Sequence, residues 1–121
     1  MFSFESLRMH RWRVPFATPE LSELEHMTKV AIARHQQYLY LREFGVLPEY
    51  QGQGYGKALL LHVQSIADER GLAMCLETFT QSNRLLYEHF GYHVVGQVNV
   101  PGCVDPWFAM VRDPLPCAKK E

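Results

Sequence analysis

The sequence predicts an α/β (α+β) fold in which helices flank a mixed central β-sheet, and three observations lead to this prediction. An apolar strand-like run, a glycine-rich turn and an amphipathic helical pattern follow one another between residues 38 and 71. A second apolar run follows that helix, which indicates a parallel pair of strands with a right-handed crossover. Near the C-terminus, two more strand-like runs are joined by a segment rich in proline and glycine, which predicts an antiparallel hairpin.

Length and composition describe one small soluble domain. The chain has 121 residues, of which 47% are hydrophobic and 21% are charged, and this is enough apolar material for a core. The formal net charge of −1 provides no global attraction for nucleic acid or an anionic membrane, so we expect neither partner. The apolar runs are too short to span a membrane, and the N-terminus lacks a signal-peptide core. We therefore expect an intracellular, cytoplasmic protein.

The cysteines and histidines predict neither a disulfide framework nor a metal site. Cys75, Cys103 and Cys117 are the three cysteines, and they show no paired spacing. The six histidines form no metal-ligand pattern. Because Cys75 stands inside an apolar run, we expect a buried thiol of low reactivity there.

The first elements of the chain are a helix and a strand. Residues 1–17 show no sustained period. Thr18–Glu20 predicts a helix start, since it offers a capping hydroxyl, a proline at the first helical position and an acid in the first turn. A largely apolar face at helical spacing carries this helix to about Arg34, and we expect it to pack against the core with little chemistry of its own. The face consists of Leu21, Leu24, Met27, Thr28, Ala31 and Ile32. The aromatic and apolar run Tyr38–Val46 predicts a central strand, which ends before a proline.

The segment Gln51–Lys57 predicts an anion-binding turn at the start of a second helix, which ends at Arg70–Gly71. The amides of a first helical turn have no intrahelical acceptor, so a glycine-rich start lets them point at a phosphate oxygen. Gly54 and Gly56 remove side chains that would keep a ligand away. Taken without its flanks, a Gly-x-Gly is as well explained by an ordinary loop.

The remaining elements follow the same logic. Leu72–Thr78 predicts a second strand, parallel to the first. Ser82 or Asn83 is expected to cap a short helix that ends at Gly91. This helix should turn three apolar side chains inward: Leu85, Leu86 and Phe90. Two strands and a charged tail complete the chain: Tyr92–Val100, Trp107–Arg112 and the residues from Pro114 onward.

Two ordered motifs resemble the GCN5-related N-acetyltransferases, the GNAT superfamily, whose members transfer an acetyl group from acetyl-coenzyme A to an amine. Gln51–Gly56 matches the family's pyrophosphate loop, Gln/Arg-x-x-Gly-x-Gly/Ala, and follows a strand that ends Phe44-Gly45-Val46. Asn83–Tyr92 is similar to the family's Asn-x-x-x-Tyr-x-x-x-Gly-Tyr/Phe helix. The resemblance covers roughly residues 38–113. Two motifs in order are far more specific than either one alone.

The resemblance implies acetyl-coenzyme A as co-substrate. The turn amides would hold the pyrophosphate, and backbone near Val46 would bond the pantetheine arm like an added strand. Gln51 either bonds the ligand or braces the turn, Lys57 either adds charge or is a solvated helix residue, and Asn83 either bonds the arm or caps its helix. The candidate coenzyme-binding residues are Val46, Gln51, Gly52, Gln53, Gly54, Tyr55, Gly56, Lys57 and Asn83.

Acetyl transfer to an amine needs an oxyanion donor, an acid for the departing thiolate and an acceptor for the proton of the amine. The resemblance places the donor at the amide of about Val46 and the acid at Tyr87, for which a core aromatic is the alternative reading. Glu77 and Glu43 are the candidate bases. Strand alternation separates Glu43 from Val46 unless a bulge intervenes, and Glu77 is alternatively a structural partner of Arg84.

The resemblance also implies elements for which this sequence leaves little room. The family has a strand, two helices and two further strands before the strand that begins here at Tyr38, and only residues 1–37 precede it. We therefore expect an abbreviated N-terminal region with one helix (1–37), an acetyl-CoA-binding core (38–113) and a tail (114–121). Tyr40 and Arg42 are expected to line the acceptor pocket, and the unpaired edge of the first strand favours a homodimer.

The sequence favours an N-acetyltransferase that acts on an amine of a small molecule or peptide. One alternative is a catalytically weak or inactive acetyl-CoA-binding remnant that serves as a binding or partner module. Another is a structural fragment whose sheet a partner completes. The intact glycine turn and Tyr87 favour the enzyme, whereas the short N-terminal region favours the alternatives.

Overall fold

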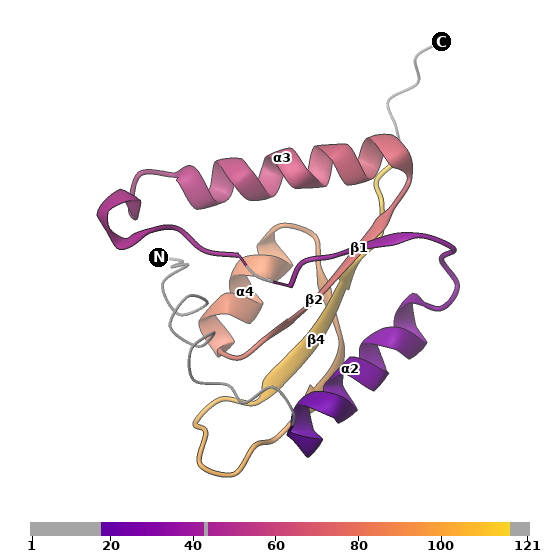
Figure 1. The fold of residues 1–121 in the computed structure, drawn as a ribbon, viewed down its shortest axis with the longest axis vertical. Helices are drawn as coiled ribbons and strands as arrows, with labels where there is room; N and C mark the ends of the chain where they lie inside the picture. Colours follow the sequence, from indigo (N-terminus) through magenta and orange to yellow (C-terminus); the bar gives the residue numbers. More distant parts are fainter. Residues whose placement is uncertain (1–17, 43, 117–121) are drawn as a thin grey trace.

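The computed structural model describes residues 18–42 and 44–116. Residues 1–17, Glu43 and residues 117–121 lie outside the described residues. Helices and strands follow one another in the predicted order, which confirms the mixed α/β (α+β) fold (Figure 1). The elements are α2 (Pro19–Ile32), β1 (Tyr38–Tyr40), a 3₁₀ turn (Pro48–Tyr50), α3 (Tyr55–Arg70), β2 (Ala73–Thr78), α4 (Gln81–His89), β3 (His93–Val98) and β4 (Trp107–Arg112).

The strands form a four-stranded sheet in the order β1-β2-β4-β3. β1 pairs with β2 in parallel, while β4 pairs antiparallel with both β2 and β3, so the predicted parallel pair and C-terminal hairpin are confirmed. The prediction of a central first strand is wrong, because β1 lies at the edge of the described sheet and β2 and β4 occupy its middle.

β1 is much shorter than the predicted Tyr38–Val46 strand. Its last ladder pair joins Tyr40 to Cys75, and the amide of Leu41 donates to the Cys75 carbonyl at 2.9 Å. The chain then leaves β2, and among the described residues no ladder continues between the two strands. Since β2 itself runs on to Thr78, its edge is unpaired on this side beyond Cys75.

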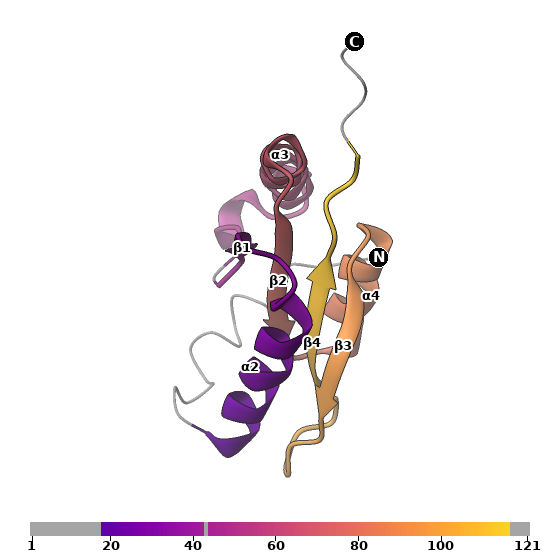
Figure 2. The same cartoon turned by 90° about the vertical axis from the view of Figure 1, so that its right-hand side faces the viewer.

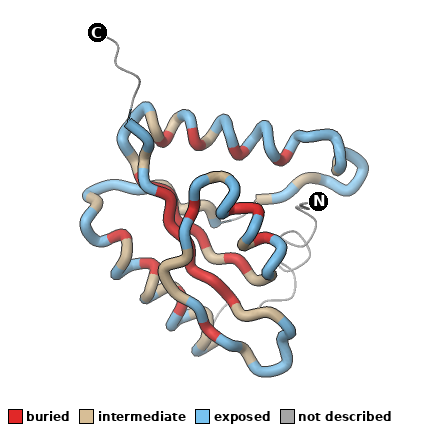
Figure 3. Tube along the Cα trace, turned by 180° about the vertical axis from the view of Figure 1, so that it is seen from behind, coloured by how far each residue is buried: buried red, intermediate tan, exposed pale blue. Residues whose placement is uncertain are grey.

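Helices cover both faces of the sheet, with α2 on one side and α3 and α4 on the other (Figures 1 and 2). On α3, the buried positions recur along the side that faces the strands (Figure 3). The core between the sheet and α3 and α4 consists of Leu60, Ala67, Met74, Leu76, Tyr87, Tyr92, Phe108 and Met110. The core under α2 consists of Leu24, Ile32, Ala73, Cys75, Val98, Trp107, Ala109 and Val111. Each face of β2 therefore belongs to a different core.

Glycine lets α2 lie close to the sheet. Gly96 follows a register shift in β3, and a Cβ at this position would stand 2.8 Å from the Cβ of Met27 on α2. Such a distance is too short for two carbon atoms, so a larger residue would push α2 outward.

The helix ends agree with the sequence in part. Thr18 caps α2 by accepting from the Leu21 amide at 3.1 Å, as predicted, although the helix ends at Ile32 rather than Arg34. The predicted cap of α4 at Ser82 or Asn83 is wrong. Thr80 holds this position, because its backbone is extended and its hydroxyl accepts from the Asn83 amide at 3.2 Å.

The inward face of α4 is also narrower than predicted. Leu86 is buried and Phe90 is half-buried against the core, but Leu85 is 45% exposed. Cys75, by contrast, is buried under α2 as predicted, and burial raises the pKa of its thiol to about 12. A thiol with this pKa is neutral at physiological pH and is a poor nucleophile.

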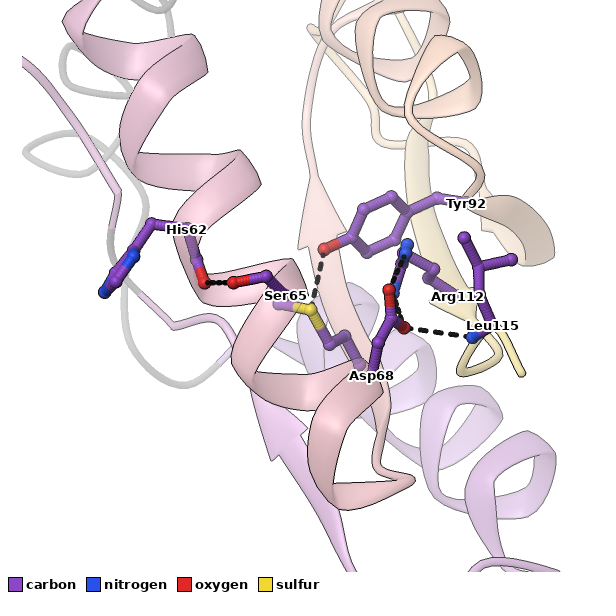
Figure 4. A network of polar contacts seen from close by, with 7 residues as sticks. His62, Ser65, Asp68, Tyr92, Arg112 and Leu115 are labelled. Carbon is purple, nitrogen blue, oxygen red and sulfur yellow. Dashed lines mark hydrogen bonds and ion pairs between the residues drawn. The ribbon is translucent and has the colours of Figure 1, made fainter. Parts of the chain in front are cut away.

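A polar network fastens the end of α3 to the end of β4 (Figure 4). The buried guanidinium of Arg112 donates to both carboxylate oxygens of Asp68, at 2.9 and 3.0 Å, and the Leu115 amide donates to the same carboxylate at 2.9 Å. Beside it, the Tyr92 hydroxyl lies 3.5 Å from the sulfur of Met74. The Arg112 hydrogen bonds lower the pKa of Asp68, so the pair remains charged well into the acidic range.

Candidate functional site

The glycine turn before α3 is built to present backbone amides. Gly52 and Gly54 adopt left-handed conformations, with φ of 81° and 85°. A Cβ at either position would meet no atom within 4 Å, so the space in front of the turn is open. The helical bonding begins with the Ala58 amide, which donates to the Gly54 carbonyl at 3.0 Å. The preceding amides, those of Tyr55–Lys57, have no intrahelical acceptor.

The helices α2, α3 and α4 differ in what accepts hydrogen bonds from the amides of their first turns. Thr18 and Thr80 each accept a first-turn amide of α2 and α4 through a hydroxyl. At α3 the cap position is Gly54, which has no side chain to accept anything. The amides of α3, together with the positive end of its helix dipole, therefore suit an external anion such as a phosphate.

One side chain near this turn holds the backbone in place by a hydrogen bond, and several others are exposed. The side-chain amide nitrogen of Gln51 donates to the Val46 carbonyl at 2.7 Å, so Gln51 braces the turn in this structure. Gly56 is buried. The other candidate side chains of the turn, Gln53, Tyr55 and Lys57, are exposed. Val46 is half-buried and stands at the end of the segment that has left β2.

The end of β2 places two different sets of side chains on its two faces. Side chains alternate along a strand, so Cys75 and Glu77 point toward α2, whereas Leu76 and Thr78 point toward α3 and α4. The edge between these faces is the part of β2 that β1 leaves unpaired. A molecule lying along this edge would thus reach groups of both faces.

Glu77 is held from two directions on the α2 face. Its Oε1 accepts a hydrogen bond from the Tyr40 hydroxyl, and its Oε2 lies 2.7 Å from the Thr28 hydroxyl. Burial raises the pKa of Glu77, and both hydrogen bonds counteract that rise. Arg84 is not its partner, contrary to that alternative, because Arg84 pairs with Glu88 at 2.7 Å on the exposed side of α4. The second candidate base, Glu43, lies outside the described residues.

Tyr87 occupies the opposite face. It is 1% exposed, and its ring meets that of Tyr92 edge to face at a centroid distance of 5.3 Å. Burial raises its pKa, so its hydroxyl keeps its proton at neutral pH. Asn83, one turn earlier on α4, is buried as well, and so is the Thr78 hydroxyl, which no group in the described part of the chain hydrogen-bonds.

The structure thus brings together some predicted residues and adds one. Tyr40, predicted to line the acceptor pocket, contacts Glu77 directly, while Arg42 is exposed with its guanidinium 5.6 Å from the Tyr40 ring centroid. Thr28 was not among the predicted site residues. The signal in the sequence was a hydroxyl on the otherwise apolar face of the helix. The structure shows that this residue is only 4% exposed.

The described residues were also compared with the requirements of a membrane span and of a metal site. Across residues 18–42 and 44–116, no helix is both long and apolar enough to cross a membrane. The same residues contain no group of three or more histidine, cysteine or acidic side chains placed to share a metal ion.

Comparison with known proteins agrees with this geometry. In the fission yeast Schizosaccharomyces pombe, an uncharacterized N-acetyltransferase is 42% identical over 53 residues, which are 44% of this chain and 22% of the relative. Two solved structures are each 26% identical over 66% of this chain. A ribosomal-protein alanine N-acetyltransferase from Escherichia coli has a TM-score of 0.51, with 57% of its chain covered. A histone acetyltransferase-related protein from Corynebacterium glutamicum has a TM-score of 0.54, with 43% covered.

The chain spans less than two thirds of the length of each of these relatives. A family model described as an acetyltransferase (GNAT) domain matches residues 24–94, which is more than half of the chain. The match includes α2 from Leu24 onward, the glycine turn, β2 and Tyr87. This protein therefore belongs to the GNAT acetyltransferase family.

Proposed function

We propose that this domain transfers an acetyl group from acetyl-coenzyme A to an amine of a small molecule or peptide. The observation that carries the proposal is the separation of the chain from β2 after Leu41, followed along the chain by the uncapped start of α3. Family membership supports the donor, because the family transfers acetyl groups from this coenzyme. The unpaired edge of β2 then provides a place where donor and acceptor meet.

The coenzyme would bind along the glycine turn and the departing segment. The amides of Gln53–Lys57 suit the pyrophosphate, because α3 lacks a side-chain cap and the space before Gly54 is open. Backbone at Val46 would bond the pantetheine arm as an added strand, with Gln51 fixing the carbonyl of Val46 in place. Buried Asn83 lies on the α4 side of this path and would bond the arm there.

Acetyl-coenzyme A supplies an activated thioester, and the protein residues manage protons and charge. Glu77 accepts a proton from the ammonium group of the acceptor, which frees the nitrogen lone pair to form the new bond to the acetyl carbon. The amide at Val46 stabilises the negative charge that develops on the carbonyl oxygen. As the carbon–sulfur bond breaks, Tyr87 donates its proton to the departing sulfur. The nitrogen loses its second proton to solvent, and exchange with solvent then returns Tyr87 to its protonated form and Glu77 to its ionised form.

The positions of the Glu77 carboxyl group and the Tyr87 phenol group support this division of roles. Glu77 and Tyr87 lie on opposite faces of β2, so an acceptor that arrives from the α2 side and a coenzyme that lies on the α3 and α4 side would meet at the strand edge. Burial keeps Tyr87 protonated as an acid should be. The solved relative that modifies an alanine of a ribosomal protein makes a peptide N-terminus a reasonable member of any acceptor panel. A cytoplasmic location is part of this proposal.

A second reading is a coenzyme-binding module of weak or absent activity. The edge position of β1 favours it, because an edge strand with free amides and carbonyls invites pairing with a second copy or another partner. This reading keeps coenzyme binding but predicts no chemistry at Glu77 and Tyr87.

The test combines calorimetry with a thiol-release assay. The protein is titrated with acetyl-coenzyme A, and free thiol is then followed with amines, aminoglycosides and peptide N-termini as acceptors. Binding together with acceptor-dependent thiol release supports the enzyme. Binding without release for every acceptor favours the module, and absence of binding contradicts both readings.

A further inference from the structure

We propose that Thr28 of α2 and Tyr40 of β1 are positioning residues that hold the Glu77 carboxyl in one orientation for proton removal from the acceptor amine. The inference rests on the proposed role of Glu77 as the base, and it assigns α2 a part in the reaction. Three elements that are distant in sequence converge on one carboxyl group: α2 through Thr28, β1 through Tyr40 and β2 through Glu77 itself.

Each carboxyl oxygen has its own hydroxyl partner. The Tyr40 hydroxyl donates to Oε1, and the Thr28 hydroxyl stands 2.7 Å from Oε2. A carboxyl group with both oxygens bonded cannot rotate about its last torsion without breaking one contact. The remaining lone pairs of the two oxygens are left for the acceptor.

Thr28 has a second contact that suits both protonation states of Glu77. Its hydroxyl also lies 3.2 Å from the carbonyl of Leu24, one turn earlier on α2. With Glu77 ionised, the hydroxyl hydrogen points to Oε2. When Glu77 has taken a proton, the hydroxyl can turn to donate to the Leu24 carbonyl and accept from the carboxyl instead. The carboxyl therefore keeps its orientation before and after proton transfer.

Tyr40 remains a donor throughout, because burial and the neighbouring Glu77 raise its pKa. The other charged or titratable groups that face Glu77 in the described part of the chain are few. Glu25 on α2 raises the pKa of Glu77, and Arg42 beyond β1 lowers it. Cys75, on the same face of β2, is neutral because burial raises its own pKa. The hydroxyls are thus the groups that bond the carboxyl directly, while Glu25 and Arg42 act through space.

The chain offers matched variants for a test. Tyr40→Phe removes one hydroxyl, and Tyr38→Phe removes the same group from the exposed tyrosine two residues earlier on β1. Thr28→Val removes the second hydroxyl at nearly constant volume, and Thr28→Ser retains it. None of these changes leaves a large cavity, and the full-length protein is used with near-ultraviolet circular dichroism as a check of the fold.

The readout is the pKa of Glu77, followed by carbon NMR of labelled glutamate carboxyls with Glu77→Gln as the assignment standard. We expect an upward shift of about one pH unit in Tyr40→Phe and a smaller upward shift in Thr28→Val, because each hydroxyl stabilises the charged form. Tyr38→Phe and Thr28→Ser should leave the pKa unchanged. The acidic limb of the kcat/KM profile for thiol release should move with the NMR value.

The outcomes separate this inference from the proposed function. An unchanged Glu77 pKa in both Tyr40→Phe and Thr28→Val, or an equal shift in Tyr38→Phe, overturns the inference while an active wild-type enzyme leaves the proposed function intact. If the Glu77 pKa shifts in the variants but the wild-type protein releases no thiol with any of the acceptors, the catalytic role of Glu77 is overturned, and with it the positioning role of Thr28 and Tyr40. A shifted pKa with a matching shift of the kinetic limb supports both.

Discussion

The two faces of β2 differ in the burial and hydrogen bonding of the ionisable side chains that pack there. On the α2 face, Glu77 is half-buried but receives two hydroxyl hydrogen bonds. On the other face, Tyr87 is 1% exposed and packs among apolar and aromatic side chains. Burial raises the pKa of Glu77 and the two hydroxyls only partly offset that rise, whereas burial of Tyr87 raises the pKa of a phenol that is neutral in any case. The sheet thereby separates Glu77, the proposed proton acceptor, from Tyr87, the proposed proton donor.

The largest expected effect comes from the α2 face. Glu77→Gln keeps the shape and the hydrogen bond from Tyr40 but removes the proton acceptor. We expect kcat to fall by about 10²- to 10⁴-fold, with the affinity for acetyl-coenzyme A unchanged. Thiol-release kinetics and calorimetry measure the two quantities. A fall in affinity equal to the fall in rate would mean that Glu77 binds the donor and that the faces are not divided by role.

The other face is tested with Tyr87→Phe. Loss of the hydroxyl should lower kcat by about 10²-fold at little cost in coenzyme affinity, since only protonation of the leaving sulfur is removed. Tyr92→Phe is the matched control, because Tyr92 lies in the same cluster with its hydroxyl bonded to Met74. Equal rates in the two variants would assign protonation of the sulfur to water or to another group.

The coenzyme contact on the α3 side is tested with Gly54→Val. A side chain at this left-handed position should obstruct the phosphate and weaken coenzyme binding by about tenfold to hundredfold, which corresponds to lost hydrogen bonds to a charged group. Gly102→Val is the control. It has the same φ of 85° and equally open surroundings, but it lies in the hairpin between β3 and β4. Equal loss of affinity in both would indicate general destabilisation rather than a phosphate site.

The smallest effect on chemistry is expected from Asp68→Asn, at the far end of α3. This change removes the charge that pairs with buried Arg112, so we expect unfolding to become easier by about 1.5–3 kcal/mol at pH 7 without a change in kcat. Urea titrations and the thiol assay report the two effects. A lower kcat in the folded variant would show that the network supports the site.

The difference in free energy of unfolding between the wild type and Asp68→Asn should depend on pH, and its sign follows from the pKa of Asp68. The pKa of Asp68 is lower in the folded protein than in the unfolded chain, where it is about 3.9. The stabilisation by the ionised Asp68 is therefore fully present at pH values above its pKa in the unfolded chain, and it is lost as the pH falls toward its pKa in the folded protein. The difference between wild type and Asp68→Asn should be constant from pH 7 to about 5 and should shrink below about pH 4. A constant difference down to pH 3 would contradict the role of the charged pair.

Local sequence determined most of the secondary structure and the coenzyme side of the site. Thr18 and Pro19 begin a helix, and Gly71 ends one, because these residues satisfy local backbone requirements. The glycines of Gln51–Lys57 mark an uncapped helix start for the same reason. The cap at Thr80 was missed because several residues able to cap stand close together in Thr80–Asn83, and only the extended backbone at Thr80 selects among them.

Tertiary structure decided the acceptor side. The sequence showed a continuous strand from Tyr38 to Val46, yet ladder hydrogen bonds end after Leu41, because the partner strand and not the local sequence sets where pairing stops. The helical period placed Thr28 on the packed face of its helix, and Tyr40 and Glu77 were assigned to two parallel strands, but these assignments gave no information on which residues would touch. Their contacts join residues that are far apart in the chain, so packing alone determined that Glu77 bonds Thr28 and Tyr40 rather than Arg84.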